Sequence, residues 1–196
     1  MENNIENNNF LIKNIIEPST QIYYITEILK KEGYKDNWNK IDFAAKIGRN
    51  DLIKLLVQLG EKGTDVAIDN AAKNGHLEVI KYLHELGYKG TENAIDNAAK
   101  NGHLEVIKYL HELGYKGTEN AIDNAAKNGH LEVIKYLISL NYKVTDTAFI
   151  CATINCHLHI LEYFHSLNLR GPEILIDIAI MGWHINTFVT RSDYKF

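Results

Sequence analysis

A histidine recurs along this chain at a fixed interval of 27 residues, as His76, His103, His130, His157 and His184. Imidazole can ligate a metal ion or act as a general base, so such a series suggests a metal or catalytic site. Packed helices lie about 8–10 Å apart, whereas a zinc–nitrogen bond measures about 2.0–2.1 Å, so histidines on successive stacked helices cannot share one ion. We therefore expect each histidine to form a hydrogen bond within the turn where it lies.

A second group that could do chemistry is the cluster of Cys151, Cys156, His157 and His159. Two thiols and two imidazoles could bind zinc, so an enzyme or zinc site in this region is one alternative. Convergence of all four is not expected, because nothing in the spacing directs the adjacent Cys156 and His157 to one point. The chain has no Ser/His/Asp, Cys/His/Asn, paired-carboxylate or phosphate-loop arrangement. We therefore expect no catalysis, no metal and no cofactor.

The elements that carry these residues are copies of one sequence. Residues 67–93 and 94–120 are identical, and residues 121–147 differ from them at six positions. A fixed period of 20–50 residues indicates stacked units that each pack on their neighbours. Extending the register predicts an Asn-rich tail with a short amphipathic segment (1–17), an N-terminal half repeat as a cap (18–39), four repeats (40–66, 67–93, 94–120 and 121–147), a divergent repeat (148–174), and a partial repeat with the C-terminal end (175–196).

Each repeat predicts two helices. In 94–120, a narrow face of alanines favours close approach of the first helix to a neighbour, and Gly102 interrupts that helix. A broad apolar stripe then predicts the second helix, which Gly114 ends as a left-handed residue. Asn141 and Asn168 stand at the equivalent positions and are the usual second choice for that conformation.

The composition limits the class of partner. The formal net charge is −4 and the pI is about 6.1, which argues against a general nucleic-acid binder, because that function needs a basic face. Two cysteines are too few for a disulfide scaffold and indicate a reducing compartment. No apolar run reaches the length of a membrane span, and the N-terminus lacks the features of a secretory signal. We expect a monomer that binds neither nucleic acid nor membrane.

The run AAKNGHLEVIKYL at residues 98–110, followed by Gly114, resembles the centre of an ankyrin repeat, and the resemblance covers about residues 22–187. It implies an all-α fold, an α-solenoid of stacked helix-turn-helix repeats. An ordinary ankyrin repeat has about 33 residues and opens with Thr-Pro-Leu-His, where this chain has Asn-Ala-Ile-Asp at 93–96. The shortening falls between Gly114 and Ala121, so we expect truncated β-turn fingers. The short form resembles arrays that are expanded in large DNA viruses and some protists.

The resemblance also implies a non-catalytic protein-interaction module that binds a protein or peptide partner on its concave face. The family's variable contact positions follow the two small residues of the first helix, and an acidic residue lies near the start of that helix. Carried over, the partner-binding residues are Lys73, Asn74, Lys100, Asn101, Lys127 and Asn128, with Glu92 and Glu119. Identical copies do not specify a target, so the alternative is a duplicated array without a single partner. Any specificity is expected in the divergent repeats, and the expected location is the cytoplasm, that of the host if the chain is viral.

Overall fold

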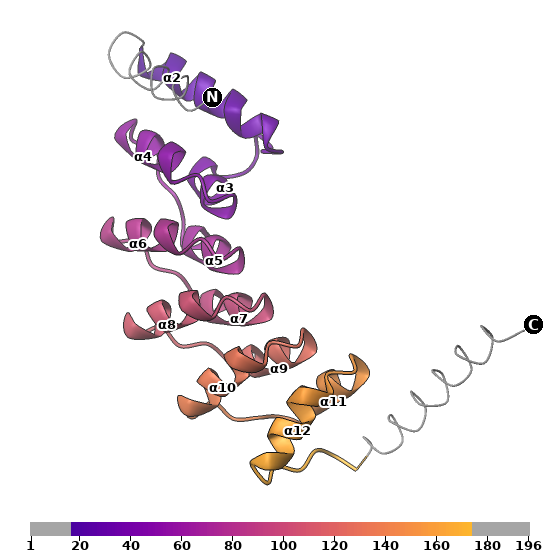
Figure 1. The fold of residues 1–196 in the computed structure, drawn as a ribbon. Coiled ribbons are helices and arrows are strands. Elements are labelled where there is room, and N and C mark those ends of the chain that lie inside the picture. Colours follow the sequence, from indigo (N-terminus) through magenta and orange to yellow (C-terminus); the bar gives the residue numbers. More distant parts are fainter. Residues whose placement is uncertain (1–16, 174–196) are drawn as a thin grey trace, which may run out of the picture. The chain divides into compact units, whose positions relative to one another are not determined.

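In a computed structural model of the chain, residues 17–173 are described, and they form α-helices joined by turns and short loops (Figure 1). No β-strand occurs in that range, which confirms the prediction of an all-α fold. The chain divides into two compact units, Met1–Thr91 and Glu92–Phe196. Their described parts, residues 17–91 and 92–173, are called the N-terminal unit and the C-terminal unit below.

The N-terminal unit has one long helix followed by two helix pairs. Its elements are α2 (Pro18–Lys31), α3 (Lys40–Lys46), α4 (Asn50–Gln58), α5 (Val66–Lys73) and α6 (Leu77–Glu85). The first helices of the two pairs, α3 and α5, pack on each other, and the second helices, α4 and α6, do the same. Helix α2 packs on α3 and α4 and so covers one end of this stack (Figure 1).

The C-terminal unit has three helix pairs. Its elements are α7 (Asn93–Lys100), α8 (Leu104–Glu112), α9 (Asn120–Lys127), α10 (Leu131–Ser139), α11 (Asp146–Ile154) and α12 (Leu158–Ser166). The first helices form a continuous row, because α9 packs on both α7 and α11. Each second helix packs on the first helix of its own pair. The predicted stacking of helix pairs is therefore present in each unit.

Alanines in the first helices allow the close packing of these rows. The alanine pairs 98–99 and 125–126 are fully buried, so the backbones of α7 and α9 can approach each other without intervening side chains. The second helices supply larger apolar side chains to the core, which in α8 are Val106, Ile107 and Leu110. Burial of one such side chain contributes about 1.5–3 kcal/mol. In stacked repeats the interfaces between neighbours add to the stability of each repeat.

The second helices end at the residues that the sequence predicts. Gly114 has a φ of +85°, and Asn141 and Asn168 have φ values of 66° and 57°, all in the left-handed region. Cys156 adopts the same region, with a φ of 58°, in the turn where the preceding repeats have glycine. The loops that follow the second helices, such as 113–119, contain no strand, as expected for truncated fingers.

The predicted amphipathic segment and the C-terminal partial repeat, including His184, lie outside the described residues, which begin at Glu17. Among residues 17–173, no helix combines the length and the apolar character that crossing a lipid bilayer requires.

Candidate functional site

The repeated histidine joins neighbouring repeats instead of bonding within its own turn. The Nε2 atom of His76 lies 3.1 Å from the carbonyl oxygen of Lys46, and that of His130 lies 3.2 Å from the carbonyl oxygen of Lys100. The prediction of a bond within the turn is therefore wrong. The reason is steric, because the ring rests on the turn glycine of the preceding repeat: a Cβ at Gly48 would lie 2.7 Å from the His76 ring. Since a carbonyl only accepts, Nε2 carries the proton and is committed to the backbone.

The cysteine and histidine side chains of the last described repeat do not share a target. The Nε2 atoms of His157 and His159 lie 3.1 Å and 3.2 Å from separate backbone carbonyls of the preceding repeat. Cys151 is half-buried, which raises the pKa of its thiol, whereas Cys156 is exposed. Within residues 17–173, no group of three or more His, Cys, Asp or Glu side chains is placed to hold a metal ion. The zinc alternative therefore has no ligand set in this part of the chain.

An aspartate in the first helices α3, α5, α7 and α9 bonds the loop that leads to the next first helix, a role that sequence reasoning missed. Asp69 accepts hydrogen bonds from the backbone amide and the hydroxyl of Thr91, at 2.8 Å and 2.6 Å. Asp96 accepts the same pair from Thr118, at 2.8 Å and 2.5 Å. Both carboxylates are buried. The recurrence of Asp and Thr 22 residues apart was the available signal, and it points to a structural role, not to acid–base chemistry.

A glycine and a tyrosine hold the same loop from its other side. The amide of Gly117 donates to the hydroxyl of Tyr142 at 2.7 Å, and the amide of Gly63 donates to the hydroxyl of Tyr88 at 3.0 Å. A Cβ at Gly117 would lie only 2.6 Å from an Asp96 carboxylate oxygen. The glycine is therefore required by close approach of the loop to the helix.

One repeat departs from this arrangement, because Val144 stands where the preceding copies have that glycine. Among the contacts of the described residues, Thr145 donates only its hydroxyl to Asp123, at 2.5 Å. Burial raises the pKa of the Asp123 carboxyl, and the Thr145 hydroxyl opposes that shift. The loop before α11 is consequently held by fewer bonds than the loops before it.

All eight predicted partner-binding residues are exposed, and they lie at the two ends of the first helices. The lysines are the last residues of α5, α7 and α9, and each asparagine follows as the C-cap. Glu92 and Glu119 occupy the N-caps of α7 and α9. Since a helix rises about 1.5 Å per residue, the lysine and glutamate of one helix are about 12 Å apart along its axis. The two signs of charge therefore form separate groups and also complement the helix dipole.

The asparagines have a structural task as well. Asn74, Asn101 and Asn128 each donate Nδ2 to the backbone carbonyl four residues earlier, at 2.9, 3.0 and 2.8 Å. The amide nitrogen thus caps the first helix, which leaves the amide oxygen for a partner. The lysines beside them form no ion pair with any residue in 17–173, so their ammonium groups remain available.

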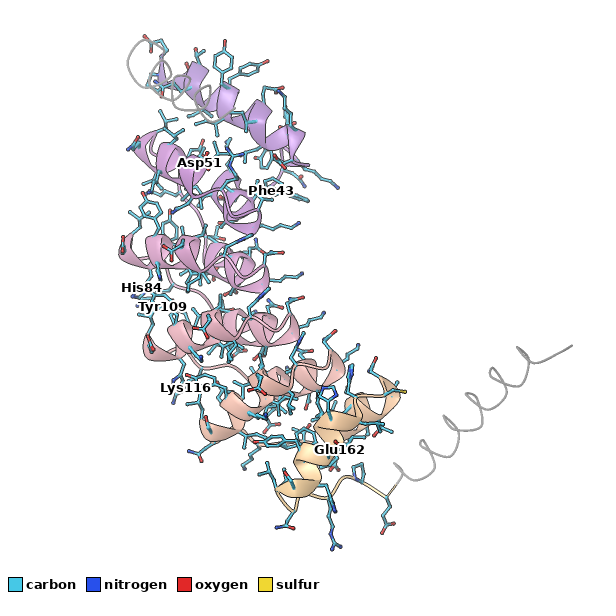
Figure 2. The ribbon with its side chains drawn as sticks, viewed as in Figure 1. Phe43, Asp51, His84, Tyr109, Lys116 and Glu162 are labelled. Atoms are coloured by element: carbon cyan, nitrogen blue, oxygen red, sulfur yellow. The ribbon has the colours of Figure 1, made fainter. Side chains whose placement is uncertain are left out.

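A shallow pocket of about 200 Å³ opens at one predicted residue of the N-terminal unit. Its lining residues are Trp38, Phe43, Lys46, Asn70 and Lys73, and Figure 2 labels Phe43 on α3. Trp38 stays 38 % exposed although Phe43 beneath it is only 4 % exposed. Trp38 lies in the predicted half repeat and is not among the predicted binding residues, so the structure adds an aromatic group to the candidate surface.

A second hollow, of about 350 Å³, lies in the C-terminal unit between the loops 116–119 and 140–143, with His111 at its wall. Lys116, which Figure 2 labels, and Lys143 line it together with Glu119. This hollow therefore presents charges of both signs and no exposed indole, and it selects no single class of ligand.

The comparisons agree with this architecture. A family model described as ankyrin repeats (many copies) matches residues 68–111, 95–138 and 122–165. These overlapping matches start at intervals of one repeat and together span half of the chain. The protein belongs to the ankyrin repeat family, whose members generally mediate protein–protein interactions and are generally non-catalytic. A search of curated proteins finds no match to the chain.

Proposed function

We propose that this protein is a non-catalytic interaction scaffold that binds a protein or peptide partner through the exposed ends of its first helices, the concave face expected from the family. The observation that carries the proposal is the row of exposed, unpaired lysines at the ends of α7 and α9, each beside an asparagine whose oxygen is free to accept. Buried alanines and the Asp–Thr bonds hold these helices rigidly, which lowers the entropic cost of binding.

The proposal also includes the location, the oligomeric state and the classes of partner of the protein. We place it in the cytoplasm as a monomer, without nucleic-acid or membrane partners. The net charge of −4 supports the absence of a nucleic-acid partner, because such a partner requires a basic face.

Affinity purification with the full chain, followed by mass spectrometry, tests the proposal. The double variant Lys100→Glu with Lys127→Glu should lose the partners that the unaltered chain retains, while circular dichroism shows an intact fold. The matched control is Lys116→Glu with Lys143→Glu, which makes the same change of net charge on exposed loop residues. Retention of every partner by the folded Lys100/Lys127 variant would show that the first-helix face is not the binding surface.

The alternative of a duplicated array without a single partner rests on the identity of 67–93 and 94–120. Deletion of residues 94–120 separates the two hypotheses, because it removes one repeat and leaves an identical one in place. Loss of partner binding in the deletion variant would support a binding surface that requires the full length of the array. Undiminished binding by the deletion variant would favour the alternative, a duplicated array without a single partner.

A further inference from the structure

Two residues that line the pocket of the N-terminal unit differ in type from their equivalents in the later copies. Trp38 stands where the following repeats have Asp65 and Glu92, and Phe43 stands where the next repeat has Asn70. An acidic side chain and an amide are thus replaced by an indole and a phenyl ring. Aromatic residues are enriched at protein-binding hot spots, whereas lysine and glutamate are depleted there.

The indole of Trp38 is held in a defined position. The hydroxyl of Tyr34 donates to the Trp38 carbonyl at 2.7 Å, and the rings of Trp38 and Phe43 lie 5.4 Å apart between centroids. The ammonium groups of Lys35 and Lys46 lie 5.5 Å and 5.3 Å from the centre of the Trp38 ring. Because these contacts fix the ring in the free protein, little conformational entropy is lost when a ligand packs on it.

The charge around this indole has one sign. Lys46 and Lys73 line the pocket with no carboxylate among the lining residues. Neither lysine forms an ion pair with another residue in 17–173. The acidic residue nearest to Trp38 in sequence, Asp36, is paired with Lys30 at 3.3 Å. The carboxylate of Asp42 is occupied by Thr64. A protein with a net charge of −4 therefore carries a local positive site here.

We infer that this pocket binds an acidic segment of a protein partner, with an apolar side chain against Trp38 and carboxylates beside Lys46 and Lys73. The inference rests on the proposed function and names the class of partner. The exposed part of the indole supplies the apolar contact, and the two unpaired lysines supply the electrostatic selection. A basic or neutral segment would leave both ammonium groups without an anionic partner.

The test uses the full chain with Trp183→Phe, so that Trp38 is the single remaining tryptophan. The probe is a pool of 12-residue peptides with Asp or Glu at the flanking positions and mixed apolar residues at the two central positions. The comparison pools carry Asn and Gln, or Lys, in place of the acids. We expect saturable quenching of Trp38 fluorescence with the acidic pool, at least tenfold tighter binding than with the neutral pool, and weakening as salt increases.

Charge reversal locates the site. Lys46→Glu with Lys73→Glu should weaken binding of the acidic pool at least tenfold, whereas Lys116→Glu with Lys143→Glu, which makes the same change of net charge on exposed loop residues, should change it less than twofold. Trp38→Phe keeps an aromatic ring in the pocket. It therefore separates the loss of the indole from a folding defect caused by Trp38→Ala. Peptide anisotropy reports binding to these Trp38 variants.

The inference is overturned if the acidic pool binds no tighter than the neutral pool. It is overturned as well if Lys116→Glu with Lys143→Glu weakens binding as much as Lys46→Glu with Lys73→Glu. It is also overturned if Trp38→Ala lowers only the thermal stability, because the aromatic cluster would then merely cover the end of the helix stack. Partners that are lost with Lys100→Glu and Lys127→Glu but retained by Trp38→Ala would leave the proposed function standing. Failure of the proposed function would appear instead as retention of every partner by the folded Lys100/Lys127 variant.

Discussion

Thr118 donates both its backbone amide and its hydroxyl to the carboxylate of Asp96, which lies 22 residues earlier on the first helix of the same repeat. These two bonds connect the loop that precedes α9 to the middle of α7. Asp42 with Thr64 and Asp69 with Thr91 form the same pair in the N-terminal unit. The spacing of successive first helices, and hence of the lysines at their ends, depends on these bonds.

Replacing Asp96 with alanine should lower the free energy of unfolding by about 2–3 kcal/mol, because hydrogen bonds to a charged group contribute about 1.5–3 kcal/mol. Asp123→Ala is the matched comparison and should lower it by only about 1 kcal/mol, since Asp123 accepts a bond from the Thr145 hydroxyl and none from the Thr145 amide. Urea unfolding monitored by circular dichroism measures both values. Equal losses in the two variants would show that the amide bond contributes nothing.

The loop glycine gives a second prediction. Gly117→Ala should lower the free energy of unfolding by about 1–3 kcal/mol, because the added Cβ would meet an Asp96 oxygen at 2.6 Å and an Ile95 methyl at 2.7 Å. Val144→Ala should be tolerated within about 0.5 kcal/mol, because a Cβ is already accommodated at this position. The measurement is the shift of the thermal midpoint. A stable Gly117→Ala variant would contradict the close approach of loop and helix.

Histidine 130 should matter for stability and not for metal binding. His130→Ala removes the bond to the Lys100 carbonyl and the packing on Gly102, with an expected loss of about 1–2 kcal/mol. His165→Ala, on an exposed position of α12, should change the stability by less than about 0.5 kcal/mol. Elemental analysis of chelator-washed protein accompanies the unfolding measurement. Stoichiometric zinc that disappears with His130→Ala would contradict a purely structural role.

The Arg49–Asp51 pair predicts a dependence on acid. The guanidinium of Arg49 donates to both carboxylate oxygens of Asp51, at 2.9 Å and 2.7 Å, and this hydrogen bonding lowers the pKa of Asp51 below its ordinary value. A lowered folded-state pKa stabilises the fold above the unfolded pKa, and that stabilisation is lost as the pH falls through the folded value. Asp51→Asn should therefore cost at most about 1 kcal/mol at pH 7, since the pair is partly exposed, and almost nothing near pH 2. A constant difference between the two proteins across this range would contradict the assignment.

Much of the fold could be predicted from the sequence because its signals are local. Each helix pair is defined by the 27-residue period, by an alanine pair in its first helix and by an apolar stripe in its second. The left-handed residues Gly114 and Asn141 mark where second helices end. The exposure of the eight predicted binding residues followed from the same register.

Contacts between repeats could not be predicted in the same way. The bond from His76 to the Lys46 carbonyl depends on the distance between two turns and on the space above Gly48, neither of which the sequence states. The Trp38 pocket was missed because Trp38 and Lys73 belong to different repeats and meet only when α3 and α5 pack. Sequence patterns within one repeat carry no information about contacts between residues of different repeats.

The central claim is that the first-helix ends contact the partner, and site-specific photocrosslinking tests it most directly. The photoreactive amino acid benzoylphenylalanine is placed at Lys100 or Lys127 in the C-terminal unit, and at Glu105 or Glu132 on the exposed face of the second helices as controls. The account predicts crosslinks to the captured partner from positions 100 and 127 and none above background from 105 and 132. Crosslinks from 105 and 132 that equal or exceed those from 100 and 127 would contradict it.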